Sequence, residues 1–211
     1  MYYWTVVAVV VVFVCSCERS ALVELRRDDS TPEQLMDKLA QAMRDRDKAL
    51  YETLLDEDFW FSETDCLGNS VFENDLETEL IIIAGSRDES SKGLFDIFRD
   101  FSYDFELIRR SRELGAEYPE AFEGDPDGHP DEDWEVLYGR VQMLMLDENG
   151  DGFRVDQFMT FKLRQDEEGH WRMVRWLDDP PGGLCVGAGK ILAEAVTWGQ
   201  IKNSIFPIGS S

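Results

Sequence analysis

The sequence predicts an α+β domain in which short helices precede a curved antiparallel sheet. Two observations lead to this class. Residues 31–55 show helical spacing of apolar side chains, and residues 134–178 hold three strand-like runs joined by two acidic turns that contain glycine. The chain of 211 residues is long enough for one domain after an export signal, and its 43% hydrophobic content is enough for a core.

The first 17 residues are typical of an export signal that ends in a lipid-modified cysteine. The apolar run 4–14 is too short to cross a bilayer of about 30 Å as a helix, but it suits a secretory signal. It ends Val14-Cys15-Ser16-Cys17, in which a small residue precedes Cys17 as in a bacterial lipobox. We therefore expect lipid on Cys17 and a membrane-anchored lipoprotein of the bacterial cell envelope that faces the periplasm or the exterior. An ordinary cleaved signal is the alternative.

The rest of the chain divides into three parts. Residues 18–30 are charged and without periodicity, so we expect a tether. We expect the folded domain to span 31–179. The breaker at 180–183 then begins a C-terminal extension, 180–211, in which we expect a helix over 191–201.

Two helices are expected at the start of the domain. Thr31 and Gln34 have the spacing of a capping box, and Pro32 suits the first helical position. The apolar stripe of this helix is Leu35, Leu39 and Met43. Asp47 is expected to cap a second helix that contains Leu50, Tyr51, Leu54 and Leu55.

The remaining elements follow from periodicity and turn chemistry. Strands are predicted over 59–61, 101–108, 137–146, 153–164 and 171–177. A further helix is predicted over 72–84, although the β-branched run 81–83 suits a strand equally well, and a solvated acidic loop is predicted over 111–133. Turns 147–152 and 165–170 contain glycine, which allows the positive φ of a tight reversal.

Charge and cysteine content limit the partners. The formal net charge of −23 argues against nucleic acid, because phosphate contacts need clustered Lys and Arg. Beyond the signal only Cys66 and Cys185 remain, and either a disulfide or two separate thiols is compatible with export. No cofactor motif is recognisable, and a homodimer is a further expectation.

The segment from Tyr51 to Phe59 and the hairpin from Gly169 to Trp176 resemble the nuclear transport factor 2-like superfamily, which includes SnoaL-like proteins and ketosteroid isomerases. The resemblance covers residues 31–179. It implies a cone, with helices packed on the concave face of a bent sheet and a pocket at the wide end. Relatives use that pocket to bind small apolar molecules or for acid–base chemistry on them. The resemblance places Phe161 where ketosteroid isomerases carry an inward acid, and Phe161 cannot transfer a proton.

Strand parity and the resemblance together predict an apolar ligand pocket in which Gln157 is the polar group. Its candidate residues are Tyr51, Trp60, Gln157, Met159, Phe161, Val174 and Trp176. Neither His129, in the acidic loop, nor His170, at a turn, is a convincing pocket base. We therefore favour a non-catalytic domain that binds a small apolar ligand or another envelope protein. The alternative is an isomerase, dehydratase or cyclase, which two buried carboxylates facing the pocket would favour.

No metal site is expected. Asp147, Asn149 and Asp151 match the first ligands of a calcium loop, but Phe158 stands where the loop needs a bidentate Glu. A hairpin turn explains these residues fully. Asp156 is interpreted as one member of a surface ion pair, and the acidic residues of 125–133 as a solvated loop.

Overall fold

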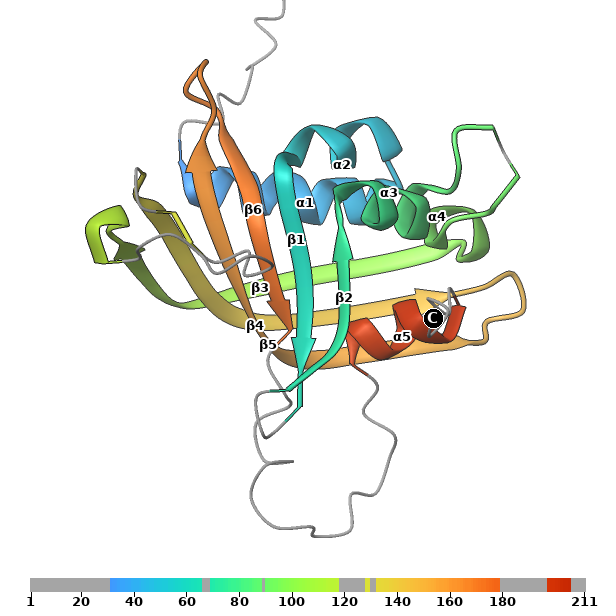
Figure 1. The fold of residues 1–211 in the computed structure, drawn as a ribbon. Helices are drawn as coiled ribbons and strands as arrows, with labels where there is room; N and C mark the ends of the chain where they lie inside the picture. Colours follow the sequence, from blue (N-terminus) through green and yellow to red (C-terminus); the bar gives the residue numbers. More distant parts are fainter. Residues whose placement is uncertain are drawn as a thin grey trace, which may run out of the picture.

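One six-stranded sheet forms the frame of the domain in the computed structural model (Figure 1). The structure describes residues 31–65, 69–88, 90–117, 128–129, 132–178 and 197–205. The export signal, the tether and all four cysteines lie outside these ranges, so the predictions about them stay predictions. None of the helices in the described ranges is long and apolar enough to cross a membrane.

The strands occur in the sheet in the order β2-β1-β6-β5-β4-β3. All neighbouring strands are antiparallel except β1 and β6, which run parallel because the chain crosses the whole sheet between them. The predicted antiparallel sheet is therefore correct in all but this pair. The strands are β1 (Leu55–Thr64), β2 (Ser70–Asp75), β3 (Asp100–Glu113), β4 (Trp134–Leu146), β5 (Gly152–Gln165) and β6 (Trp171–Asp178).

The first helix confirms its predicted cap and stripe. The Thr31 hydroxyl accepts from the Gln34 backbone N–H at 3.3 Å, and the Gln34 side chain accepts from the Thr31 N–H at 3.2 Å. Leu35, Leu39 and Met43 are fully buried. The helices are α1 (Pro32–Asp45), α2 (Lys48–Leu54), α3 (Leu76–Ala84), α4 (Leu94–Ile97) and α5 (Trp198–Ile205), with a 3₁₀ turn at Gly115–Glu117.

Several predicted boundaries were wrong. Leu55, predicted in the second helix, begins strand β1, which extends on both sides of the predicted 59–61. The segment 72–84 begins as strand β2 and becomes helix α3 only after Asp75, whose carboxylate accepts the Thr78 N–H at 2.9 Å. Residues 111–113 of the predicted loop belong to β3, which pairs with β4 as far as Glu113. The C-terminal helix runs from Trp198 to Ile205, later than the predicted 191–201.

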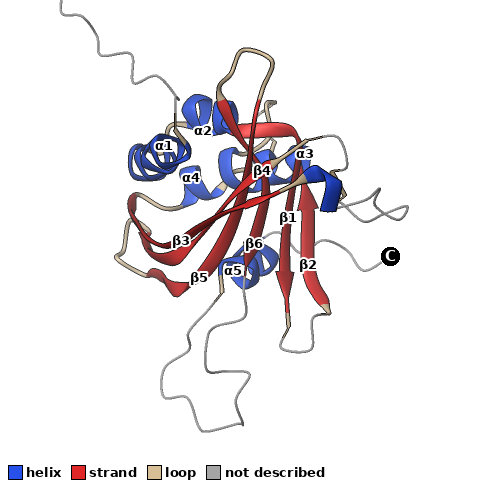
Figure 2. Ribbon diagram, turned by 90° about the vertical axis from the view of Figure 1, so that its left-hand side faces the viewer, coloured by secondary structure: helices blue, strands red, loops and turns tan. Residues whose placement is uncertain are grey.

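Strand β5 has the predicted alternation, and its buried residues Val155, Gln157, Met159, Phe161 and Leu163 face the concave side. Strand β3 shifts register against β4 next to Gly139. A Cβ at Gly139 would lie 2.3 Å from the Phe105 ring, so only glycine fits this close approach. Helix α1 lies on the concave side, and α5 lies within the same curve of the sheet (Figures 1 and 2). We call this side the interior.

Candidate functional site

The floor of the interior is aromatic. Phe161 of β5 and Phe61 of β1 are both register partners of Trp176 of β6, so their side chains lie on one face. The Phe161 and Trp176 ring centroids are 5.1 Å apart, and those of Phe61 and Trp176 are 6.1 Å apart. The indole N–H of Trp176 donates to the Met159 sulfur at 3.2 Å. All four side chains are fully buried.

A buried carboxylate, Glu79 of α3, faces this floor. The Tyr51 hydroxyl donates to Glu79 Oε1 at 2.7 Å. The Asn74 amide and the Lys202 ammonium both donate to Glu79 Oε2, each at 2.6 Å. Burial, together with the charge of Glu79, raises the pKa of Tyr51 well above its ordinary value. Tyr51 is therefore a hydrogen-bond donor at neutral pH.

Lys202 reaches Glu79 from helix α5, and its side chain is fully buried. Its Nζ lies 3.6 Å from the centroid of the Phe61 ring, 5.3 Å from that of Trp176 and 5.2 Å from that of Trp198. These distances are those of cation–π contacts. Burial lowers the pKa of Lys202, and the charge of Glu79 opposes that shift.

Two further buried carboxylates accept hydrogen bonds from the start of α5. Glu63 and Asp178 are register partners on β1 and β6, and both point inward. The Thr197 hydroxyl donates to Glu63 at 2.5 Å, and the Gly199 backbone N–H donates to Asp178 at 2.9 Å. A helix N-terminus carries partial positive charge, so these acids complement it. Burial raises the pKa of Glu63, and the hydrogen bond from Thr197 opposes this.

The structure brings together five of the seven predicted pocket residues. Tyr51, Gln157, Met159, Phe161 and Trp176 all face the interior. Gln157 is buried, and its Oε1 accepts the backbone N–H of Trp198 at 3.2 Å, so the polar group predicted for the pocket contacts α5.

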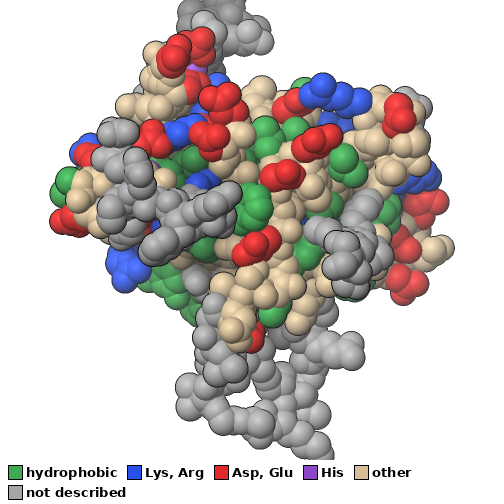
Figure 3. Space-filling view, in the orientation of Figure 1, with side chains coloured by type: hydrophobic (Ala, Val, Ile, Leu, Met, Phe, Trp, Pro, Cys, Tyr) green, Lys and Arg blue, Asp and Glu red, His purple; other side chains and the backbone are tan. Residues whose placement is uncertain are grey.

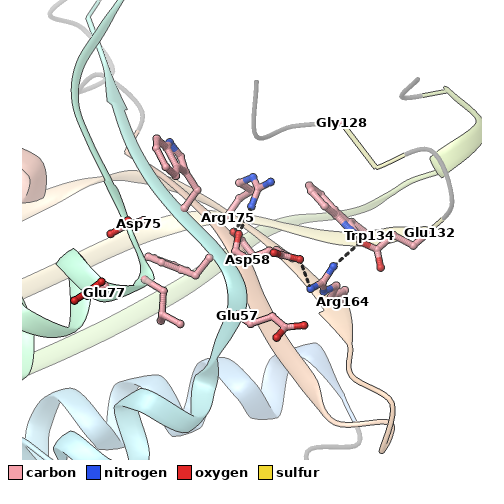
Figure 4. Close-up of a pocket in the computed structure, with 13 residues that line it drawn as sticks. Glu57, Asp58, Asp75, Glu77, Gly128, Glu132, Trp134, Arg164 and Arg175 are labelled. Atoms are coloured by element: carbon pink, nitrogen blue, oxygen red, sulfur yellow. Dashed lines mark hydrogen bonds and ion pairs between the residues drawn. The ribbon is translucent and has the colours of Figure 1, made fainter. Parts of the chain in front are cut away.

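Trp60 and Val174 lie elsewhere, against expectation. Trp60 has the opposite strand parity to Phe61, and Val174 is the extra residue where β6 shifts register against β5. Both line a groove of about 620 Å³ on the outer face of the sheet (Figure 4). The other residues of the groove include Glu57, Asp58, Asp75, Glu77, Glu132, Trp134, Arg164 and Arg175.

The cations of the outer groove are already used within the chain. Arg164 donates to the carboxylates of Asp56, Asp58 and Glu132 (Figure 4 shows part of this network). Arg175 donates to the Asp58 carbonyl at 2.7 Å and lies 5.1 Å from the Trp134 ring centroid. These contacts hold strands together, so we regard the interior as the better candidate site.

His129 lies on this outer face as well. Its ring stacks on Trp134 with centroids 3.9 Å apart, and its Nε2 is 3.4 Å from a Glu113 carboxylate oxygen. It does not reach the interior, in agreement with the prediction that it is not a pocket base.

The polar residues singled out on the hairpins have structural partners. Asp156 forms a two-point contact with Arg140 at 2.7 and 2.8 Å, a surface ion pair as predicted. Asp147 accepts the backbone N–H groups of Asn149 and Asp151, as a hairpin turn requires.

Asp166, Glu168 and His170 lie close enough to hold a cation on the second hairpin turn. Asp166 already accepts the backbone N–H groups of Glu168 and His170 and the Arg172 guanidinium. This arrangement fits a turn held by local hydrogen bonds.

Sequence reasoning missed the interior acids and Lys202. A clear signal existed for two of them. Glu79 lies at helical spacing from Ile82 and Ile83 on α3, and Lys202 falls on the apolar stripe of α5 beside Trp198, Ile201 and Ile205. A charged residue within an apolar helical stripe indicates a buried partner. Glu63 and Asp178 had a weaker signal, since each continues the strand alternation of buried aromatic residues, Phe59 and Phe61 on β1 and Trp176 on β6.

No protein-family model matches the chain, and no curated protein matches it significantly. Solved structures are similar in fold. One is a conserved protein from Planctomyces limnophilus DSM 3776, with 10% identity over 70% of this chain and 91% of that chain and a TM-score of 0.49.

Two more are a nuclear transport factor 2 (NTF2-like) superfamily protein from Salmonella enterica and a ketosteroid isomerase-like protein from Erwinia carotovora. The first has 11% identity over 74% of this chain and 93% of that chain and a TM-score of 0.46. The second has 12% identity over 69% and 89% and a TM-score of 0.42. Identities this low concern the fold and not the site. The structures similar to this chain thus include nuclear transport factor 2-like proteins, the superfamily that the sequence resembles.

Proposed function

We propose that this chain is a lipid-anchored, non-catalytic binding domain of the bacterial cell envelope, and that its interior takes a small ligand of largely apolar character. The supporting observation is that the interior combines an aromatic floor with buried polar groups already held in position. Glu79 is held by hydrogen bonds from Tyr51 and Asn74. Gln157 is buried on the same face of β5 as Met159 and Phe161. An apolar surface with a few placed polar groups is typical of the walls of small-molecule sites.

The bonding of Glu79 supports binding over catalysis. Three donors approach its two carboxylate oxygens, so it is not free to accept a substrate proton. Phe161, at the position where the resemblance places an acid, packs against Phe105 and Trp176.

The enzyme alternative has one specific observation in its favour. Glu63 and Asp178 are buried, adjacent and inward, and burial raises the pKa of Glu63 toward the range useful for proton transfer. Both acids accept hydrogen bonds from the first turn of α5. Their role as counter-charges to that helix is why we place binding first.

A ligand screen tests the proposal. Thermal-shift screening of the purified chain with small apolar and amphiphilic molecules should give hits that weaken in Gln157→Ala. Glu77→Ala is the matched control, because Glu77 lines the outer groove. Hits that weaken in Glu77→Ala alone would move the site to the outer groove and overturn the proposal.

Recovery of the ligand separates the two functions. A hit recovered chemically unchanged after long incubation supports binding. A hit that is converted, with conversion lost in Glu63→Gln, would establish the enzyme instead.

A further inference from the structure

We propose that the interior is a site for the ammonium group of a small amine ligand, and that Lys202 of α5 occupies this site in cis until the ligand replaces it. The inference rests on the proposed binding function and adds the ligand class and its regulation. Three observations support it: the contacts of the Lys202 ammonium, the residues outside α5 that hold Glu79 in place, and the contacts between α5 and the sheet.

The surroundings of Lys202 Nζ are those of an ammonium cage. One carboxylate oxygen of Glu79 lies at 2.6 Å, and the face of Phe61 lies at 3.6 Å from the cation. Trp176 completes the wall contributed by the sheet. Aromatic faces combined with a carboxylate recognise alkylammonium groups in preference to neutral groups of the same size.

The cage is formed without help from α5. Tyr51 comes from α2, Asn74 from β2 and Glu79 from α3, and the two hydrogen bonds among them orient the carboxylate. Phe61 and Trp176 lie on adjacent strands of the sheet. A site held by its own neighbours does not have to reorganise when one cation is exchanged for another.

The interior offers more polar groups than Lys202 uses. Glu63, Glu79 and Asp178 are all buried on this side, against one ammonium. Among the described residues, the Gln157 Nε2 and the Asn74 Oδ1 are buried and have no hydrogen-bond partner. A structural ion pair needs neither of these two groups, whereas a polar ligand with its own donors and acceptors would pair with them.

Helix α5 is short, and its release would expose Trp198 and Ile201, which are fully buried. It has eight residues, and a helix this short is marginal by itself in water. Its first turn is held by polar contacts from Thr197, Trp198 and Gly199 to acids and an amide of the sheet. A buried ion pair adds little net stability, because both charges lose their hydration. A free amine that offers the same ammonium can take over the contact with Glu79, but release of α5 must also offset the exposure of Trp198 and Ile201 and therefore requires a high amine concentration.

The first experiment is rescue of Lys202→Ala in the full-length chain. This change removes the atoms beyond Cβ, and n-propylammonium restores them as a free molecule. We expect n-propylammonium to raise the Tm of Lys202→Ala saturably, by about 5 °C near saturation. The neutral 1-propanol should give little or no rise, and the rise should vanish in Lys202→Ala with Glu79→Gln.

Lys48→Ala is the matched control. Lys48 also pairs with a carboxylate, Asp96 at 2.7 Å, but its side chain is 44% exposed. It should show no specific rescue. If Lys202→Ala is unfolded alone, the measurement becomes recovery of near-ultraviolet circular dichroism during refolding with each probe.

The outcomes distinguish the ammonium site from the apolar binding function. An equal response to n-propylammonium and 1-propanol would overturn the ammonium site and leave the apolar binding function standing. No response to either probe would count against both.

The second experiment tests occupation in cis. In the unmodified chain, n-propylammonium at concentrations that saturate Lys202→Ala should increase deuterium uptake at the amides of 198–205 and leave β5 protected. Unchanged uptake in α5 would show that Lys202 is a permanent structural residue, and it would overturn the exchange of ligand for lysine.

Discussion

Phe161 shows at the scale of one residue how the apolar floor is built. Its ring contacts Phe105 edge-on at 5.3 Å and Trp176 at 5.1 Å, and no part of it is exposed. A residue in this position stabilises the fold and shapes the interior at once, because the same ring packs the core and forms the surface that a ligand would touch.

Replacing Phe161 by Ala should cost about 3–5 kcal/mol in the free energy of unfolding, the usual cost of truncating a fully buried aromatic side chain. Urea melts of the variant and the parent measure this. Phe158→Ala is the control, since Phe158 is only partly buried, on the opposite face of β5. Similar losses of unfolding free energy in the two variants would contradict the assignment of Phe161 to the inward face of β5 and Phe158 to the outward face.

Glu63 should make stability depend on pH in a defined direction. Burial raises its folded pKa above the ordinary 4.5, so the folded chain holds this proton more tightly than the unfolded chain. The stability it contributes is complete below the ordinary pKa and is lost as pH rises through the raised value.

Glu63→Gln lacks this titration. Its free energy of unfolding, relative to the parent, should therefore increase between about pH 4 and pH 7. Urea melts across this range measure the difference, with Glu167→Gln as an exposed control. If the difference in free energy of unfolding stays constant or falls with pH, the pKa of Glu63 is not raised in the folded chain.

At the scale of one element, the backbone of α5 at Gly199 approaches the Glu63 side chain closely. A Cβ at Gly199 would lie 2.1 Å from a Glu63 carboxylate oxygen, so glycine is what allows the first turn to rest on β1 and β6. The capping contacts between Thr197 and Gln200 fix the same turn. The interior is closed only while this turn fits.

Gly199→Ala should therefore loosen α5 without altering Lys202 or Glu79. We expect faster amide exchange over 200–205, with little change in β5, because the Glu63 carboxylate must move to admit the methyl group. Hydrogen exchange read by mass spectrometry measures it. Gly150→Ala is a control in a turn where the new methyl meets nothing within 4 Å, although the positive φ of Gly150 adds local strain. Unchanged exchange in α5 would contradict this close approach.

At the scale of the whole molecule, the acidic charge bears on how the predicted export signal would attach the chain to a membrane. Acidic and basic side chains are interspersed on the face shown in Figure 3, within a total charge of −23. Such a surface favours solubility and offers no clustered cations to phosphates. Attachment to a membrane would then depend on the lipid and not on charge.

Cys17 should be the mature N-terminus and carry lipid. Mass spectrometry of the membrane fraction should find a diacylglyceryl group on Cys17, and Cys17→Ser should release the chain from that fraction. Cys15→Ser is the matched control and should change nothing. A soluble, unmodified chain that begins at another residue would contradict the lipobox interpretation.

The sequence by itself determined most of the secondary structure and most of the apolar floor, but not strand β2 or helix α4. The cap at Thr31, the stripe of α1 and the alternation of β5 are local patterns, and local patterns survive folding because they reflect backbone geometry. Helix 72–84 was misjudged because the local signal is the same for the end of β2 and the start of α3. Only pairing with β1 decides that boundary.

The polar interior was decided by the tertiary structure. Glu63, Glu79, Asp178 and Lys202 are far apart in the chain, and no spacing in the sequence relates them. They meet because β1 pairs in parallel with β6 and because α5 returns into the curve of the sheet. Val174 left the predicted pocket because of a register shift between β5 and β6, which cannot be read from one strand. Trp60 lies outside because Phe61 pairs with the inward Trp176, and neighbouring residues of a strand point to opposite faces.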